Sequence, residues 1–229
     1  MGQDSPDLAA KAMEVHRRLV QLYGQRRRIP RREPMHELVA TMLSHRTTQK
    51  NEAQAYERMW QRFGSWEAIR DAPLEELAQA IRGANFEYAK AGNIQKALRV
   101  ITEAQGKPDI GFLGDLSAEE GRDWLMQLPG VGIKTASLVL LFCFGKPLLP
   151  VDTHVHRVSW RVGLIAPKVS AEKAHHELLA LLPPDPEVLY NFHVNMLHLG
   201  QRVCLSRSPR HGQCPLTDIC DYYLARHES

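Results

Sequence analysis

The sequence predicts an all-α fold, because apolar residues recur at intervals of three and four along most of the chain. No stretch shows the alternation of apolar and polar residues that is typical of a β-strand. The clearest pattern is a pair of apolar helical stretches on either side of a short, glycine-containing turn at 128–132. We therefore expect a chain of roughly ten helices that includes one helix–hairpin–helix.

Length and composition are those of an ordinary globular protein with a mildly basic balance. The chain has 229 residues, 44% of them hydrophobic and 24% charged, and a formal net charge of +3. Such a chain can bury one core or two small ones, and its charge is compatible with a nucleic-acid partner. Five arginines lie close together, namely Arg26, Arg27, Arg28, Arg31 and Arg32. This cluster fits a solvated linker as well as a phosphate-binding patch.

Neither a membrane span nor a secretory leader is expected. Charged residues interrupt the first apolar stretch at 8–23, and the most apolar run, 136–144, is too short to cross a bilayer. Three of the four cysteines lie near the C-terminus, which argues against a disulfide scaffold in a chain of this size. We therefore expect a soluble, cytoplasmic protein that makes no membrane contact.

The helices expected before the glycine turn share apolar residues at helical spacing. They cover 8–23, 35–63 with a break near 44–48, 73–81 and 87–103. A loop rich in glycine, proline and aspartate follows at 106–115. Ser117 and Glu120 then form a capping-box pattern that begins the helix leading into the turn.

After the turn we expect an apolar helix to residue 144 and a connector at 145–150. Further helices are expected at 153–162, at 171–182 after a Ser170 cap, and at 186–202. The tail from Cys204 has the proline and glycine content of a loop.

The turn itself has the composition of an anion site. Gly130 and Gly132 allow backbone conformations and close approaches that a side chain would prevent. Uncapped N–H groups at a helix start favour an anion such as a DNA phosphate, and Lys134 falls in the first turn of that helix. The simpler alternative is a helix–turn–helix corner that binds nothing.

Four side chains suited to bind a metal lie close together in the tail: Cys204, His211, Cys214 and Cys220. Turn residues between them allow short ligand loops to converge on one centre. Three thiolates and one imidazole suit tetrahedral Zn²⁺, whereas a [4Fe–4S] cluster most often uses four thiolates, so both remain open from the residues alone. The third alternative is a set of unrelated thiols. Cys143, on the apolar helix, is expected to be a small buried residue.

Three motifs in a fixed order resemble one family. The segments 128–136 and 150–157 and the spacing of the cysteine tail are similar to endonuclease III, a bifunctional DNA glycosylase of the helix–hairpin–helix superfamily. The resemblance covers about 34–220. It implies a six-helix barrel domain at 29–146, and a second domain built from 1–28 and 147–229 that carries an iron–sulfur cluster.

The resemblance also implies a reaction. Double-stranded DNA with a damaged base or an abasic site would bind a monomer in the cleft between the domains, with the damaged nucleotide rotated out of the duplex. Lys134 would be the nucleophile that expels an oxidised pyrimidine through a Schiff base and cuts the strand by β-elimination, and Asp152 would be its partner. A free lysine titrates near pH 10.4, and a helix N-terminus is expected to lower that value. The simpler roles are a phosphate contact for Lys134 and a helix N-cap for Asp152.

The sequence departs from the family pattern at three expected site positions. His211 replaces a cysteine, which favours a [4Fe–4S] cluster with an unusual imidazole ligand over Zn²⁺ and predicts a raised reduction potential. Arg46 replaces a glutamine that enters the base stack, and Phe86 replaces a leucine wedge. The alternatives for these two are a surface arginine and a core aromatic. The residues expected to contact DNA are Gly130, Val131, Gly132, Arg46, Phe86 and His154.

Two other functions are compatible with the same motifs. A monofunctional glycosylase of the superfamily normally lacks the hairpin lysine, so Lys134 argues against it. A protein that binds lesions or abasic sites without cutting them is the alternative from another class.

Overall fold

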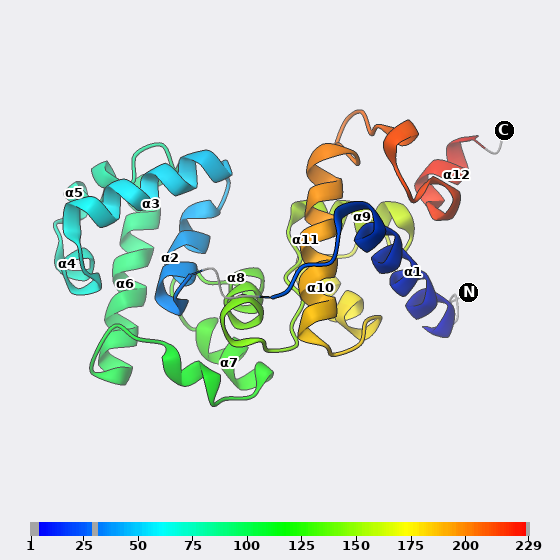
Figure 1. Ribbon diagram of the computed structural model, residues 1–229. Helices are drawn as coiled ribbons and strands as arrows, with labels where there is room; N and C mark the ends of the chain where they lie inside the picture. The colour runs from blue at the N-terminus through cyan, green and yellow to red at the C-terminus, as the bar shows by residue number, and fades with distance from the viewer. Residues whose placement is uncertain (1–4, 29–31, 228–229) are drawn as a thin grey trace. The chain divides into compact units, whose positions relative to one another are not determined.

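The computed structural model describes residues 5–28 and 32–227. Within these ranges all the regular secondary structure is helical (Figure 1). The predicted all-α class is confirmed. The α-helices are α1 (Ser5–Tyr23), α2 (Pro34–Ser44), α3 (Gln49–Phe63), α4 (Trp66–Asp71), α5 (Leu74–Ala80), α6 (Glu87–Gln105), α7 (Ala118–Leu125), α8 (Ile133–Val139), α9 (Thr153–Val162), α10 (Ala171–Ala180), α11 (Pro186–Arg202) and α12 (Asp221–His227). Short helical turns of other kinds are η1 (Gly111–Gly114), η2 (Leu140–Phe144), η3 (His211–Gln213) and η4 (Thr217–Ile219).

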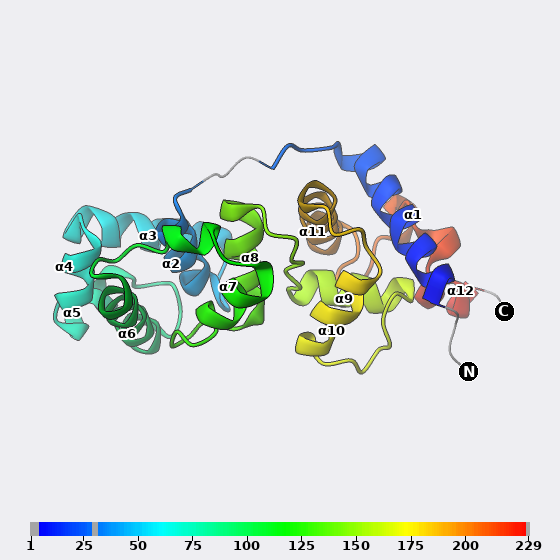
Figure 2. The ribbon, with the colours of Figure 1, turned by 90° about the horizontal axis from the view of Figure 1, so that it is seen from below.

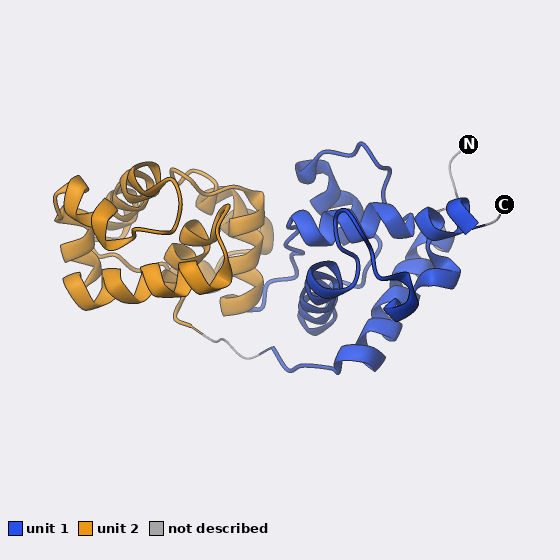
Figure 3. Ribbon diagram, turned by 90° about the horizontal axis from the view of Figure 1, so that it is seen from above, with its two compact units in different colours: residues 1–29, 145–229 blue, residues 30–144 orange. Residues whose placement is uncertain are grey.

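The chain divides into two compact units (Figure 3). Unit 1 contains residues 1–29 and 145–229, and unit 2 contains residues 30–144. The assignment of 29–146, and of 1–28 with 147–229, as functional domains stays a prediction. No helix in the described part of the chain is long and apolar enough to cross a membrane.

Helix α2 lies at the centre of unit 2. Seven of its eleven residues are buried, and it packs against α3, α6 and α8. A helix covered on several sides needs apolar residues around most of its circumference, which explains the nearly uninterrupted run Leu38–Leu43. This packing places α2 next to α8, the helix that carries Lys134.

The predicted break near 44–48 is confirmed. Helix α2 ends at Ser44, and the Thr48 side chain begins α3 by accepting a hydrogen bond from the Asn51 N–H at 3.2 Å. Helix α4 was not predicted, although its start has a recognisable cap in which Ser65 accepts from the Ala68 N–H at 3.1 Å. The helix expected to continue to residue 144 instead ends at Val139 and passes into the π-helical turn η2.

In unit 1, α11 packs against α1 and α9, and it also holds the arginine-rich segment after α1. Asn191 Oδ1 accepts from the Arg26 N–H at 2.7 Å, and Asn191 Nδ2 donates to the Arg26 carbonyl at 2.8 Å. The Arg28 N–H donates to the Glu187 carboxylate at 3.0 Å. The backbone of residues 26 and 28 is therefore held on α11. Neither a solvated linker nor a phosphate-binding patch, the two alternatives expected for this segment, includes such contacts. Arg31 lies outside the described residues.

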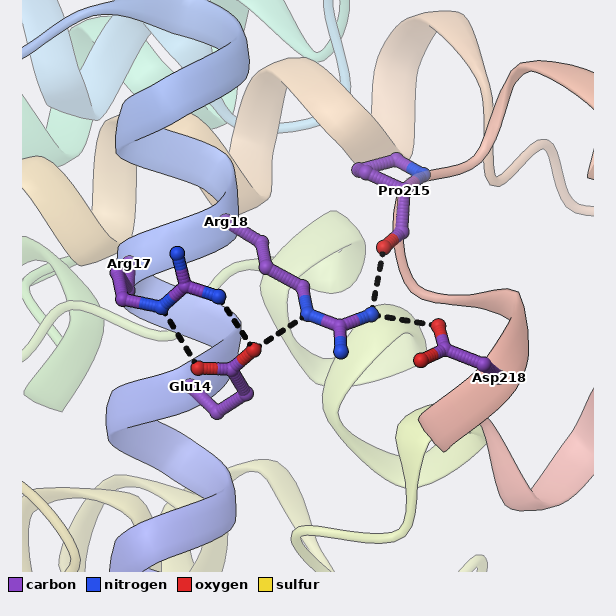
Figure 4. A network of polar contacts seen from close by, with 5 residues as sticks. All are labelled: Glu14, Arg17, Arg18, Pro215 and Asp218. Atoms are coloured by element: carbon purple, nitrogen blue, oxygen red, sulfur yellow. Dashed lines mark hydrogen bonds and ion pairs between the residues drawn. The ribbon is translucent and has the colours of Figure 1, made fainter.

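Helix α1 is also bound to the cysteine-containing tail. Arg18 donates to the Pro215 carbonyl at 3.1 Å and to Asp218 at 2.5 Å, while Glu14 accepts from Arg18 at 2.6 Å (Figure 4). Hydrogen bonds from Arg17 and Arg18 lower the pKa of Glu14 to about 2. An ion pair of 2.6 Å between Lys11 of α1 and Asp221 of α12 agrees with the neighbouring positions of these helices in Figures 1 and 2. Helix α12 was not predicted.

The capping box predicted for α7 is confirmed. Ser117 Oγ accepts from the Glu120 N–H at 3.2 Å, and Glu120 accepts from the Ser117 N–H at 2.9 Å. Replacing Ser117 by alanine should lower the free energy of unfolding by about 1 kcal/mol, because a helix N–H group loses its partner. Chemical denaturation followed by circular dichroism measures this loss. The exposed Glu119→Gln in the same turn serves as control, and equal stabilities of the two variants would contradict the assignment.

Candidate active site

Lys134 is the second residue of α8, and the helix begins without a side-chain cap. The N-cap residue is Gly132, which has no side chain to accept from the first N–H groups. The N-terminal end of the helix dipole, which carries partial positive charge, therefore has no capping side chain and favours an anionic group. Lys134 itself is half-buried. The sequence expectation that a lysine and uncapped N–H groups share one helix start agrees with this arrangement.

The two glycines of the turn differ in their structural reasons. Gly130 has φ +80°, and a Cβ atom there would lie 2.9 Å from Asn93 Nδ2, so both conformation and space require glycine. Gly132 has φ −106°, and a Cβ atom added there would meet no other group within 4 Å. The turn between α7 and α8 can be followed in Figure 2. Of these two glycines, therefore, only Gly132 has open space beside it that another molecule could enter.

Val131, between these glycines, is part of the packed hairpin. Its side chain is buried, and its N–H donates to the Leu128 carbonyl at 3.1 Å. An expected contact of Val131 with DNA stays a prediction, and its N–H is already used.

The charge of Lys134 affects the pKa values of two other groups of unit 2, His45 and Glu37. His45 Nε2 lies 3.1 Å from the hydroxyl of Thr135, the residue after the lysine. Desolvation, followed by the positive charges of Lys134 and Lys90, lowers the pKa of His45 to about 4. Burial raises the pKa of Glu37, and Lys134 is among the cations that oppose this shift. His45 is therefore neutral at pH 7 beside the lysine, a feature that the sequence motifs did not reveal.

Arg46 and Phe86 lie together on unit 2. Phe86 is 58% exposed, and the Arg46 guanidinium lies 5.8 Å from the centre of its ring. Both residues have left-handed backbone conformations, with φ of 52° and 55°. The alternative that Phe86 is a core aromatic is therefore wrong. Left-handed backbone at a residue other than glycine is uncommon and concentrates at functional positions.

Asp152 is the N-cap of α9, as the simpler alternative had it. Its Oδ1 accepts from the N–H groups of His154 at 2.9 Å and Val155 at 2.8 Å. Both of these hydrogen bonds of the cap use the same carboxylate oxygen, Oδ1. Lys134 belongs to unit 2 and Asp152 to unit 1, so their pairing stays a prediction.

Two buried histidines fix the segment that leads to Asp152. His175 Nε2 accepts from the Val151 N–H at 3.0 Å, and His193 Nδ1 lies 2.8 Å from the Pro150 carbonyl. Because His175 Nδ1 faces the Ala171 carbonyl at 2.7 Å, the proton of this ring must be on Nδ1. Neither histidine was predicted from the sequence, since nothing in the local sequence marks them.

His154, the second residue of α9, lies against α11. Arg157 Nη2 lies 3.0 Å from His154 Nδ1 and 2.7 Å from the Gly200 carbonyl. A Cβ atom at Gly200 would lie 2.7 Å from His154 Cβ, so the two helices meet closely at this point. The contact of His154 with DNA stays a prediction.

The four expected ligands of the tail line a single pocket, namely Cys204, His211, Cys214 and Cys220. Within the described residues, no three acidic, histidine or cysteine side chains are arranged tightly enough for a single metal ion. Burial raises the pKa of Cys214 to about 11 and also raises that of Cys220, so a positively charged group is needed to keep these sulfurs as thiolates. The donor set fits an iron–sulfur cluster in this pocket.

Arg161 connects two of these sulfurs and was not singled out from the sequence. Its guanidinium donates to Cys204 Sγ at 3.3 Å, and its carbonyl accepts from Cys220 Sγ at 3.3 Å. His211 meets the Tyr223 ring edge to face at 4.8 Å.

Two family models match the chain. The model for "HhH-GPD superfamily base excision DNA repair protein" matches residues 39–184, and the model for "iron-sulfur binding domain of endonuclease III" matches residues 204–220. The first match includes the hairpin and the Asp152 segment, and the second includes all four expected ligands.

Curated relatives and solved structures agree with these matches. The chain is 34% identical to endonuclease III of Thermotoga maritima over 85% of each chain, and 32% identical to endonuclease III of Escherichia coli over 82% of this chain and 84% of that protein. It is also 32% identical to a thymine/uracil-DNA glycosylase of Pyrobaculum aerophilum, over 85% of this chain and 83% of that one. A trapped covalent endonuclease III–DNA intermediate has a TM-score of 0.81 at 29% identity, covering 95% of this chain and 98% of that one.

The two glycines give a matched pair of variants. Gly130→Ala should destabilise the protein by about 1–3 kcal/mol, because it forces a left-handed φ and a clash with Asn93. Gly132→Ala should change stability by less than about 1 kcal/mol, since its φ is ordinary and its surroundings are open. Thermal or chemical unfolding of both variants measures the difference. Equal losses would show that the hairpin is not built as described.

Proposed function

Because the chain belongs to the endonuclease III family of HhH-GPD base excision DNA repair proteins, we propose that Lys134 and Asp152 carry its chemistry. The protein is a DNA glycosylase and AP lyase that removes oxidised pyrimidines and contains a [4Fe–4S] cluster. The observation that carries the residue assignment is the position of Lys134, half-buried in the first turn of an uncapped helix directly after the family's hairpin.

The Lys134 amine is proposed to attack C1′ of the damaged nucleotide. A bond forms between Nζ and C1′ as the bond from C1′ to the base breaks, and the base leaves with a proton. The C1′–O4′ bond then breaks as O4′ takes up a proton from water to become a hydroxyl, and the nitrogen lone pair forms a C1′=N double bond, which gives a protonated Schiff base. Loss of a proton from C2′ then breaks the C3′–oxygen bond, which cuts the strand on the 3′ side, and water finally releases the lysine.

Asp152 is proposed to stabilise the positive charge that develops on the sugar as the base departs. Its carboxylate is oriented by the two N–H groups of the α9 N-terminus, and the preceding backbone is held by His175 and His193. These contacts support the proposed role, because they hold the carboxylate in one position before the substrate binds.

DNA contacts are proposed for several of the expected residues. The open space at Gly132 and the uncapped start of α8 suit a backbone phosphate. Gly130 holds the turn that presents them. Exposed Arg46 and Phe86 are suited to phosphate or base contacts and to stacking. The proposed partner is double-stranded DNA with damaged bases or abasic sites, bound by a monomer in the cytoplasm.

Cys204, His211, Cys214 and Cys220 are the proposed ligands of the cluster. Their common pocket and the family match over residues 204–220 support this set. The bound cluster would supply a rigid, covalently held centre for the tail, which α1 already fixes through Arg18. No step of the proposed reaction uses it.

Borohydride trapping tests the nucleophile. Wild-type protein should form a covalent complex with an abasic oligonucleotide, and Lys134→Ala should reduce its yield at least about 100-fold, because no other amine has this position. Asp152→Asn should keep the N-cap, since the amide oxygen still accepts, while the rate of base excision falls about 10- to 1000-fold. Asp152→Ala should lose in addition about 1 kcal/mol of stability. Undiminished cross-linking by Lys134→Ala would refute the assignment, and a retarded but uncut duplex with wild-type protein would indicate a non-cleaving binder.

Iron analysis tests the ligand set. Wild-type protein and His211→Cys should both contain about four iron atoms and absorb near 400 nm, whereas His211→Ala should lose iron faster in air. Restoring a thiolate should also lower the reduction potential, because a thiolate donates more charge than a neutral imidazole. Protein-film voltammetry measures this shift. Equal potentials of wild type and His211→Cys would show that His211 does not bind the cluster.

A further inference from the structure

Two loops of unit 2 carry the exposed pair Arg46 and Phe86. We call them the paired loops, residues 44–48 and 82–86. Arg46, Asn85 and Phe86 are the residues other than glycine with positive φ in the described chain, and all three lie in these loops. Such backbone persists only where its surroundings hold it in place.

The surrounding group is Lys90, a buried lysine of α6 that is 7% exposed. Its ammonium group donates to the carbonyls of Leu43 and His45, each at 2.6 Å, and to the carbonyl of Ala84. An ammonium group has three N–H donors, so these contacts use all of them. Two of the carbonyls belong to the end of α2 and the first loop, and the third belongs to the second loop.

Further hydrogen bonds join the same two loops. Asn85 Nδ2 donates to the Arg46 carbonyl at 2.7 Å, and the Thr47 hydroxyl lies 3.5 Å from the Gly83 carbonyl. The paired loops are therefore one connected body. The position of the Arg46 guanidinium over the Phe86 ring follows from this connection.

Lysine suits this position because its ammonium group supplies both a positive charge and three hydrogen-bond donors. Carbonyls at the end of a helix carry partial negative charge and attract a cation. Burial lowers the pKa of Lys90, and Glu87 of the same helix opposes that shift. Methionine would fill a similar volume, but it would leave three carbonyls without this donor. A planar guanidinium could not meet three carbonyls that surround a single nitrogen.

We propose that Lys90 is a positioning residue that holds Arg46 and Phe86 ready to enter the base stack of a damaged duplex. A wedge acts best when its side chains are held before binding, because ordering them during binding would weaken the interaction. The inference rests on the proposed function, since the partner of the wedge is the duplex on which the enzyme acts. Lys90 contacts backbone only and takes no part in the covalent steps.

The test compares Lys90→Met and Lys90→Arg with the exposed Lys96→Met of the same helix as control. Hydrogen–deuterium exchange of 43–48 and 82–86 should become at least about 10-fold faster in the Lys90 variants only. Single-turnover excision of a lesion from duplex DNA should fall about 10- to 100-fold. Cleavage of a single-stranded abasic oligonucleotide, which has no stack to enter, should stay within about 2-fold of wild type.

Coupling to the wedge distinguishes positioning from general damage. In the background Arg46→Ala with Phe86→Ala, adding Lys90→Met should cause no more than about a 2-fold further loss of duplex excision, because its effect passes through those side chains. A full additive loss, unchanged exchange of the loops, or an equal loss on single strands would each overturn the proposal. If Lys90→Met does not fold, Asn85→Ala, which removes one tie, should show the same pattern with a smaller loss. Failure of wild-type protein to cut the abasic strand would instead refute the proposed function, while loop exchange still reports whether Lys90 holds the loops.

Discussion

Buried polar side chains that bind distant backbone groups are the interaction on which the functional parts of this protein depend. A helical fold satisfies its own backbone only inside helices, so every irregular segment needs partners from elsewhere. Here those partners are long-range and few: Lys90 holds the ends of two loops, His175 and His193 hold the segment before Asp152, and Asn191 holds the segment at Arg26. Removing such a group leaves unsatisfied carbonyls and N–H groups, which is more costly than losing one apolar contact.

This dependence explains what sequence could and could not predict. Helices α9 and α11 were predicted with their observed bounds because apolar periodicity and caps are local signals. Helices α4 and α12 are short, and the π-helical turn η2 has no local signature, so they were missed or misassigned. The functional motifs were also local: the hairpin, Asp152 with its cap, and the cysteine spacing.

The supporting residues could not be found in the same way. Lys90 reads in the sequence as one more surface lysine of an amphipathic helix, yet it is buried. His175 is directly followed by a second histidine, His176, and nothing in the sequence distinguishes the two; only the closeness of His175 to Val151 in space gives it a role. Phe86 shows the reverse case, since an aromatic residue is ordinarily buried and this one is mostly exposed. Its left-handed backbone requires the contacts of residues far along the chain, which no window of sequence contains.

The cysteine-containing tail is also held by side chains from distant helices, in this case by arginines. A loop of residues 204–220 has too few apolar side chains to form a core, and burial raises the pKa of its Cys214 and Cys220 thiols, so these two need a cation to ionise. Arg18 fixes it from α1 through Pro215 and Asp218, and Arg161 fixes it from α9 by donating to the carbonyls of Leu205 and Ser206 and to Cys204 Sγ. Neither set of contacts includes His211, so the path of the loop at these points does not depend on the residue at position 211. A change from cysteine to histidine is therefore a change in the charge of the cluster's surroundings, made within a loop whose path other residues determine.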